Sequence, residues 1–226
     1  MCFSAAASFT ASGLLAASSV AISRVPKEGA SRPLALFPAV FAVHQLAEGV
    51  IWLNNDGVVP DGYRSAALYV YALVAFCLWP VLVPFSAYLI EAGKARRRIV
   101  LACQVVGSGV GLSYLASILR GPVGVSANCC GLTYEVHAPW LLGAPYLLAV
   151  SVPFLASSRR SLVFFGAGVA LSAAAAALAA SSRTFPSVWC FFAALLSGGL
   201  YLHFRAEAPV VRPAHRGGIA SGALAR

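Results

Sequence analysis

The chain has 226 residues, of which 60% are hydrophobic and only 10% are charged. Soluble domains carry roughly 25% charged residues, so a soluble fold of this length could not bury so much apolar surface. Most of the chain must therefore lie in lipid. The net charge of +9 could indicate a nucleic-acid-binding protein, but the basic residues form short clusters between apolar runs. That arrangement is typical of anchoring to anionic lipid, and we exclude nucleic acid as a partner.

Seven segments are apolar enough to form membrane-spanning helices, each of which needs roughly 20 residues. In chain order they are residues 3–22, 33–53, 66–90, 99–119, 139–156, 162–180 and 188–204. We therefore predict an all-α polytopic membrane bundle of about seven transmembrane helices, with short connections between antiparallel neighbours. This membrane domain covers residues 1–206. Residues 207–226 are rich in Pro, Gly, Ala and Arg, and we expect them to form a disordered basic cytoplasmic tail.

The basic residues predict the orientation of this bundle. If the seven segments alternate in direction, 13 of the 16 Lys and Arg residues fall on one side. The positive-inside rule makes that side cytoplasmic, so the N-terminus lies outside and the C-terminus inside. Three Trp residues near the predicted outer ends would serve as interfacial anchors: Trp52, Trp140 and Trp189. We expect a multi-pass protein of the inner (plasma) membrane of a bacterium.

Small residues and prolines punctuate the predicted helices. Gly107 and Gly111 lie one helical turn apart, a spacing that allows two helix backbones to approach closely. The sequence does not distinguish packing within the chain from packing against a second copy. Prolines predict kinks in three of the helices, at Pro38, Pro80, Pro84, Pro145 and Pro153.

Only two acidic or basic residues lie deep in a predicted span, and both are in the second one. His44 and Glu48 are four residues apart, so they share a helix face. A charged group at this depth costs at least about 2.5 kcal/mol, which predicts a polar ligand-binding site inside the bundle, open to the outer face. Gln45 would be a further ligand-binding residue, and Tyr69 is a candidate neighbour. The alternative is that His44 donates a hydrogen bond to Glu48 and the pair only specifies packing.

Two familiar membrane cofactors do not fit the sequence. The only lysines, Lys27 and Lys94, lie in predicted cytoplasmic loops, so no helix offers a Schiff-base lysine for retinal. No second histidine lies at the depth of His44, because His203 is near the inner end of the seventh segment, and haem ligation between two histidines is not expected.

A transition metal is the remaining cofactor candidate. The longest predicted outer loop, residues 120–138, contains two cysteines and a histidine that could fold inward. Thiolate and imidazole groups suit copper or zinc. The predicted metal-ligand set is His44, Glu48, Cys2, Cys129, Cys130 and His137.

The same thiols have a simpler use. An oxidising outer compartment favours disulfides, and Cys2 could pair with Cys129 or Cys130. The pairing among these three residues and Cys190 stays open.

Two stretches carry a resemblance to a known family. The opening Met1-Cys2-Phe3-Ser4-Ala5, and the run from Pro38 to Trp52 with its His44-Gln45-Leu46 and Glu48-Gly49, resemble an uncharacterised bacterial family of multi-pass membrane proteins. The resemblance implies a membrane domain with polar residues in the second helix. It implies no activity, because the family is one of unknown function.

Three classes of function fit these observations. The first is a binding or sensing membrane protein that holds a small ligand, a metal ion or a proton around His44 and Glu48. The second is an intramembrane enzyme in which Cys2 or Cys129 is the nucleophile and His44 or His137 the base. The third is an accessory subunit of a larger membrane complex. Membrane lipid is the expected partner in each case, and a membrane-protein partner or a homo-oligomer stays open.

Overall fold

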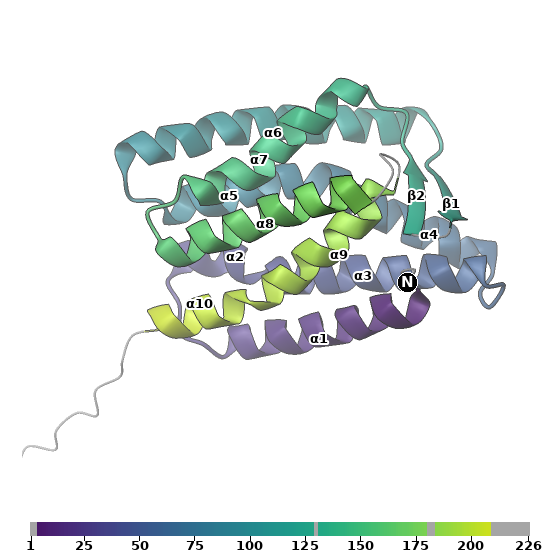
Figure 1. Cartoon of the computed structure of the whole chain (residues 1–226), viewed down its shortest axis with the longest axis horizontal. Helices are drawn as coiled ribbons and strands as arrows, with labels where there is room; N and C mark the ends of the chain where they lie inside the picture. Colours follow the sequence, from purple (N-terminus) through teal and green to yellow (C-terminus); the bar gives the residue numbers. More distant parts are fainter. Residues whose placement is uncertain (1–3, 129–130, 180–183, 209–226) are drawn as a thin grey trace, which may run out of the picture.

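The computed structural model describes residues 4–128, 131–179 and 184–208. Within these residues, six helical runs are long and apolar enough to cross a membrane. They are Ala5–Ser23, Gly29–Asn55, Asp61–Ile90, Lys94–Arg120, Arg160–Leu178 and Phe185–Glu207. A further apolar helix, Trp140–Leu155, is shorter and covers the fifth predicted span. The helices lie side by side in one elongated bundle (Figure 1), so the predicted all-helical fold is confirmed, with six rather than seven described runs long and apolar enough to cross a membrane.

The runs are divided by short irregular turns. In the first half, the elements are α1 (Ala5–Ser23), η1 (Gly29–Ser31), α2 (Arg32–Ala35), α3 (Phe37–Asn55), α4 (Asp61–Ala72), the π-helical segment η2 (Leu73–Leu78), α5 (Trp79–Ile90) and α6 (Lys94–Arg120). The second half contains β1 (Gly124–Asn128), β2 (Gly131–Glu135), η3 (Trp140–Leu142), α7 (Gly143–Leu155), α8 (Arg160–Ala179), α9 (Phe185–Gly198) and α10 (Leu200–Glu207).

The π-helical segment η2 follows from a proline. The N–H of Trp79 bonds to the carbonyl of Val74, five residues earlier. Pro80 has no N–H with which to continue that pattern onto the carbonyl of Ala75. The hydroxyl of Tyr146, on α7, donates to this carbonyl instead at 2.5 Å. A neighbouring helix thus satisfies the carbonyl that the proline leaves free.

The glycines of α6 pack within the chain. A Cβ atom on Gly107 would lie 1.8 Å from the carbonyl oxygen of Pro80, and one on Gly111 would lie 2.8 Å from that of Cys77. Only a residue without a side chain allows α6 to lie this close to η2 and α5. The question that the sequence left open is answered for these two glycines by an intramolecular contact.

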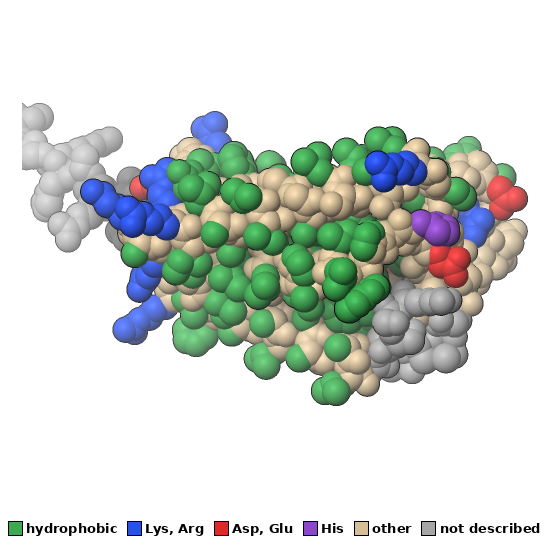
Figure 2. All heavy atoms as spheres, turned by 90° about the horizontal axis from the view of Figure 1, so that it is seen from above, with side chains coloured by type: hydrophobic (Ala, Val, Ile, Leu, Met, Phe, Trp, Pro, Cys, Tyr) green, Lys and Arg blue, Asp and Glu red, His purple; other side chains and the backbone are tan. Residues whose placement is uncertain are grey.

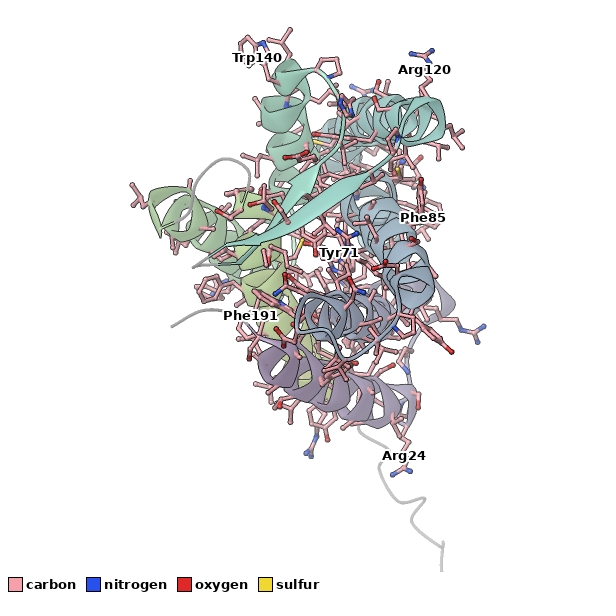
Figure 3. All side chains as sticks on the ribbon, turned by 90° about the vertical axis from the view of Figure 1, so that its right-hand side faces the viewer. Arg24, Tyr71, Phe85, Arg120, Trp140 and Phe191 are labelled. Atoms are coloured by element: carbon pink, nitrogen blue, oxygen red, sulfur yellow. The ribbon has the colours of Figure 1, made fainter. Side chains whose placement is uncertain are left out.

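A two-stranded antiparallel hairpin, β1 and β2, occupies the loop that the sequence analysis left without structure. Val125 pairs with Tyr134 and Ala127 with Leu132. The side chain of Arg64, in α4, donates to the carbonyl of Val125 at 2.7 Å and fastens the hairpin to the bundle. Figure 3 shows the hairpin lying across one end of the bundle, which we call the hairpin end.

The opposite end, which we call the basic end, holds all the described Lys and Arg residues except Arg64 and Arg120. Figure 2 shows basic side chains gathered at this end of one face, next to a broad hydrophobic belt. The ion pair between Arg159 and Glu207 joins the start of α8 to the end of α10 here. Most of the predicted tail, residues 209–226, lies outside the described residues.

Candidate functional site: a buried polar cluster beneath the hairpin

Helix α3 carries three polar side chains, those of His44, Gln45 and Glu48, into the interior of the bundle. His44 and Gln45 are 0% exposed, and Glu48 is 2% exposed. Their spacing places them on one side of the helix, while Val43 and Leu46 are half exposed on the other. The sequence-predicted site residues on this helix are therefore all brought into one buried position.

The carboxylate of Glu48 is held by two hydrogen bonds. The hydroxyl of Ser187, on α9, donates to one carboxylate oxygen. The side-chain amide of Gln45 donates to the other at 3.4 Å. Ser187 is itself 0% exposed, so this carboxylate is fixed between two helices that are far apart in the sequence.

The imidazole of His44 is not held in this way. Within the part of the chain that the structure describes, neither Nδ1 nor Nε2 has a hydrogen-bond partner. Its ring lies against Tyr71, with the two ring centroids 4.1 Å apart, and 6.2 Å from the ring of Phe41. The hydrogen bond from His44 to Glu48 that the packing alternative required is not formed.

A pair of tyrosines closes the cluster toward the hairpin end. Tyr71, on α4, is stacked on Tyr134 of β2 with ring centroids 3.9 Å apart and planes inclined by 7°. Burial raises the pKa of the Tyr134 phenol well above its ordinary value, and the negative charge of Glu48 raises it further. In Figure 3 the hairpin crosses the bundle in front of Tyr71. The hairpin thus covers the cluster at this end of the bundle.

Other predicted site residues are not gathered here. His137 is exposed in the segment after β2, and Tyr69 is exposed on α4, whose Tyr71 occupies the place we expected for it. Cys2, Cys129 and Cys130 lie outside the described residues. Among those described, no three His, Cys, Asp or Glu side chains are arranged to hold a metal ion. The proposed metal set therefore stays a prediction.

Three residues of the cluster were missed by sequence reasoning: Tyr71, Tyr134 and Ser187. None of the three carries a formal charge at neutral pH, so none stands out in an apolar sequence. Cys190, which we considered for a disulfide, is a free cysteine that is 4% exposed and packs in the same buried cluster as Tyr71 and Tyr134. Trp189, which we expected as an interfacial anchor, is also buried, and its ring N–H donates to the carbonyl of Val169 at 3.2 Å.

The fold and the site together define a multi-pass membrane helix bundle with an internal polar cluster. An imidazole and a carboxylate in one buried place can bind a cation, exchange a proton, or hydrogen-bond a small polar molecule.

Comparison with known families identifies the chain further. It belongs to a family of unknown function, DUF6629, whose model matches residues 1–215. The resemblance seen in the sequence is confirmed. Comparisons with curated proteins and with solved structures give no significant match.

Proposed function

We propose that this protein is a membrane-embedded binding or sensing protein that holds a small ligand, a metal ion or a proton at the cluster around His44 and Glu48. One observation carries the proposal: the fully buried imidazole of His44 has no hydrogen-bond partner on either nitrogen among the described residues. Burying an unsatisfied polar group costs about 1–3 kcal/mol. A bound ligand that engages His44 would remove this cost.

The two residues differ in their expected roles. Glu48 is fixed by Ser187 and Gln45, so it presents a carboxylate in a set position. His44 is the free group that would meet the ligand or accept the proton. A metal ion would need further ligands, for which the candidates remain Cys2, Cys129, Cys130 and His137.

The proposed orientation places the cluster near the outer surface. The hairpin end carries only Arg64 and Arg120 among the described basic residues, whereas the basic end carries the others. By the positive-inside rule, the basic end then faces the cytoplasm and the hairpin end faces outward. On this proposal α7 completes seven crossings of the inner membrane of a bacterium, with the N-terminus outside and the C-terminus in the cytoplasm.

The first experiment measures the metal content per chain of the detergent-purified protein. His44→Ala and Glu48→Gln are compared with the wild type, and His137→Ala tests whether the exposed histidine at the same end is a further ligand. If the ligand is a metal, the wild type carries one equivalent that His44→Ala and Glu48→Gln both lose. If His137→Ala also loses it, His137 belongs to the ligand set.

If the wild type contains no metal, a second measurement is made on the same variants. Unfolding is then followed across pH 5 to 8, where an imidazole titrates. A free energy of unfolding that rises as the pH falls in the wild type and in His137→Ala, but not in His44→Ala, would support proton binding by the folded protein. A buried imidazole that stays neutral gives the opposite slope, because it takes up its proton only on unfolding. Identical metal content and identical pH profiles in all four proteins would overturn metal and proton binding at His44 and Glu48. A small organic ligand, or an accessory subunit without a site of its own, would then remain.

A further inference from the structure

A second feature of the hairpin end is a pocket in the side of the bundle. Its volume is about 540 Å³, and it lies between η2, α6, α7, α8 and α9. Pockets of about 300–1,000 Å³ are typical of small-molecule sites. The pocket is distinct from the polar cluster, but Cys190 lines it while packing in the same buried cluster as Tyr71. Cys190 is therefore the wall between the pocket and the polar cluster.

Aromatic rings form the walls of this pocket. On one side Phe76 and Tyr114 are stacked with centroids 5.0 Å apart, and on the other Phe185 and Trp189 are stacked at 5.5 Å. Tyr146 joins the two sides, because its ring makes edge contacts with Tyr114 at 6.4 Å and with Trp189 at 5.9 Å. Two stacked pairs that face a common space suit a flat ring, which gains from offset or edge contacts with aromatic side chains.

The polar atoms of two of these rings are already used within the protein. The hydroxyl of Tyr146 donates to the carbonyl of Ala75, and the ring N–H of Trp189 donates to that of Val169. A ligand therefore meets an apolar surface from both of them. Its own polar group must point either outward or inward past Cys190. There the hydroxyl of Tyr71 lies close to Tyr134 and to the Cys190 thiol, but it makes no hydrogen bond of normal geometry within the described chain.

The pocket also offers an approach beside the hairpin. Trp140 and Gly143, at the start of the η3–α7 segment, are exposed and line the pocket. In Figure 3 Trp140 points away from the bundle at its edge. A molecule dissolved in lipid can reach this side of the bundle without passing through the hairpin.

We infer that the polar cluster receives its ligand from the lipid, and that the ligand is a membrane-soluble ring compound bearing a hydroxyl or carbonyl oxygen, of the phenol or quinone class. The inference rests on the proposed function, whose ligand it specifies. The ring lies between the aromatic walls of the pocket. Its oxygen lies beside Cys190. Tyr71 is buried and does not line the pocket, so the side chain of Cys190 turns aside for this oxygen to hydrogen-bond the phenol of Tyr71, close to Glu48 and His44.

The test uses decylubiquinone as the probe and the quenching of tryptophan fluorescence as the readout, since Trp140 and Trp189 both line the pocket. Gly143→Phe fills the pocket, because a Cβ atom at Gly143 meets nothing within 4 Å. Gly109→Phe is the matched control: that exposed glycine on α6 also has open space around it and does not line the pocket. Tyr71→Phe removes only the hydroxyl and keeps the ring that stacks on Tyr134.

We expect saturable quenching with the same affinity in the wild type and in Gly109→Phe. In Gly143→Phe the affinity should fall at least about tenfold because the ring is excluded from the pocket. In Tyr71→Phe it should fall about three- to tenfold, the effect of losing one hydrogen bond. Wild-type affinity in Gly143→Phe would overturn the inference.

Two further outcomes separate this inference from the proposed function. Wild-type affinity in Tyr71→Phe combined with loss in Gly143→Phe would overturn the link to the cluster and leave only an apolar lipid groove. No saturable quenching in the wild type, together with a metal content or pH profile that depends on His44, would overturn the quinone inference while the proposed function stands. Quenching that depends on Gly143 and Tyr71 in a protein whose His44→Ala variant behaves as the wild type would overturn the role of His44 but not the ligand class.

Discussion

Each end of the bundle buries a carboxylate, and the surroundings of the two differ. At the basic end, Glu91 is 4% exposed and accepts hydrogen bonds from the backbone N–H groups of Gly93 at 2.9 Å and Ser158 at 2.8 Å. These bonds tie the connection between α5 and α6 to that between α7 and α8. At the hairpin end, Glu48 is held equally well, but His44 beside it has no partner among the described residues.

The difference indicates two kinds of buried polar site. A group whose hydrogen bonds are all made within the protein stabilises the fold, and its removal leaves backbone donors unsatisfied. A group that is buried without partners destabilises the fold and is expected where a ligand supplies what the protein lacks. The comparison therefore predicts effects of opposite sign on stability at the two ends.

The largest effect on stability should come from the close packing of α6 against α5, which lies between the two ends. Gly107→Ala would place a methyl group 1.8 Å from the carbonyl oxygen of Pro80, so α6 could no longer pack against α5. We expect the free energy of unfolding to fall by at least about 3 kcal/mol, as for severe overpacking, measured by denaturant titration in detergent. Gly109→Ala is the control because its Cβ meets nothing within 4 Å. Equal stability of the two variants would contradict this close approach.

The next effect should be a loss of stability at the basic end. Glu91→Ala removes the acceptor of two part-buried hydrogen bonds from backbone N–H groups, and we expect a loss of about 2 kcal/mol in the same titration. Glu28→Ala, an exposed carboxylate at the same end, should change stability by less than about 0.5 kcal/mol. If the two variants were equally stable, the hydrogen bonds of Glu91 would not stabilise the fold.

At the hairpin end we expect the opposite effect on stability, namely that removing a buried polar side chain raises the free energy of unfolding. His44→Leu replaces a buried imidazole without hydrogen bonds by an apolar side chain of similar size. We expect the free energy of unfolding of the ligand-free protein to rise by about 1 kcal/mol. His137→Leu, on the exposed histidine, controls for a general effect of adding a leucine. A marked loss of stability in His44→Leu would mean that His44 holds the fold together, as Glu91 does.

The smallest effect concerns the basic end. There we expect the contribution of Glu91 to the free energy of unfolding to depend on pH. Burial raises the pKa of Glu91, but the hydrogen bonds from Gly93 and Ser158 and the charge of Arg96 outweigh it, so the net pKa lies below its ordinary value of 4.5. The stabilisation is then complete above this ordinary value and is lost as the pH falls through the lower folded-state value. The difference in unfolding free energy between the wild type and Glu91→Gln should be constant near neutral pH and shrink below pH 4.5. A constant difference down to pH 3 would contradict the lowered pKa.

Much of the bundle was predictable because the hydrophobic run is a strong signal in lipid. The positions of the helices, and the polar face of α3 with His44 and Glu48, follow from the sequence alone. The short helix Trp140–Leu155 was placed to within one residue at each end, and its role as a seventh span stays a prediction.

The hairpin and half of the cluster were not predictable in the same way. The residues around Asn128 and Gly131 carry a weak turn signal. We interpreted this loop as a source of metal ligands and did not predict strands in it. Tyr71, Tyr134, Ser187 and Cys190 come from three elements that meet α3 only in the folded bundle. The choice of Tyr69 over Tyr71 was wrong because the rotation of a helix about its axis depends on its neighbours and not on its own residues.

The hydrogen bond from Tyr146 to Ala75 also bears on the order in which the protein is assembled. The carbonyl that Pro80 leaves free is satisfied by α7, which follows α4, η2 and α5 in the chain and is therefore synthesised after them. Until α7 arrives, the third helical run carries an unsatisfied carbonyl in lipid and has no partner that fixes its π-helical turn. The final shape of this run, and with it the position of Tyr71 in the polar cluster, is therefore set late in biosynthesis by a segment encoded well downstream.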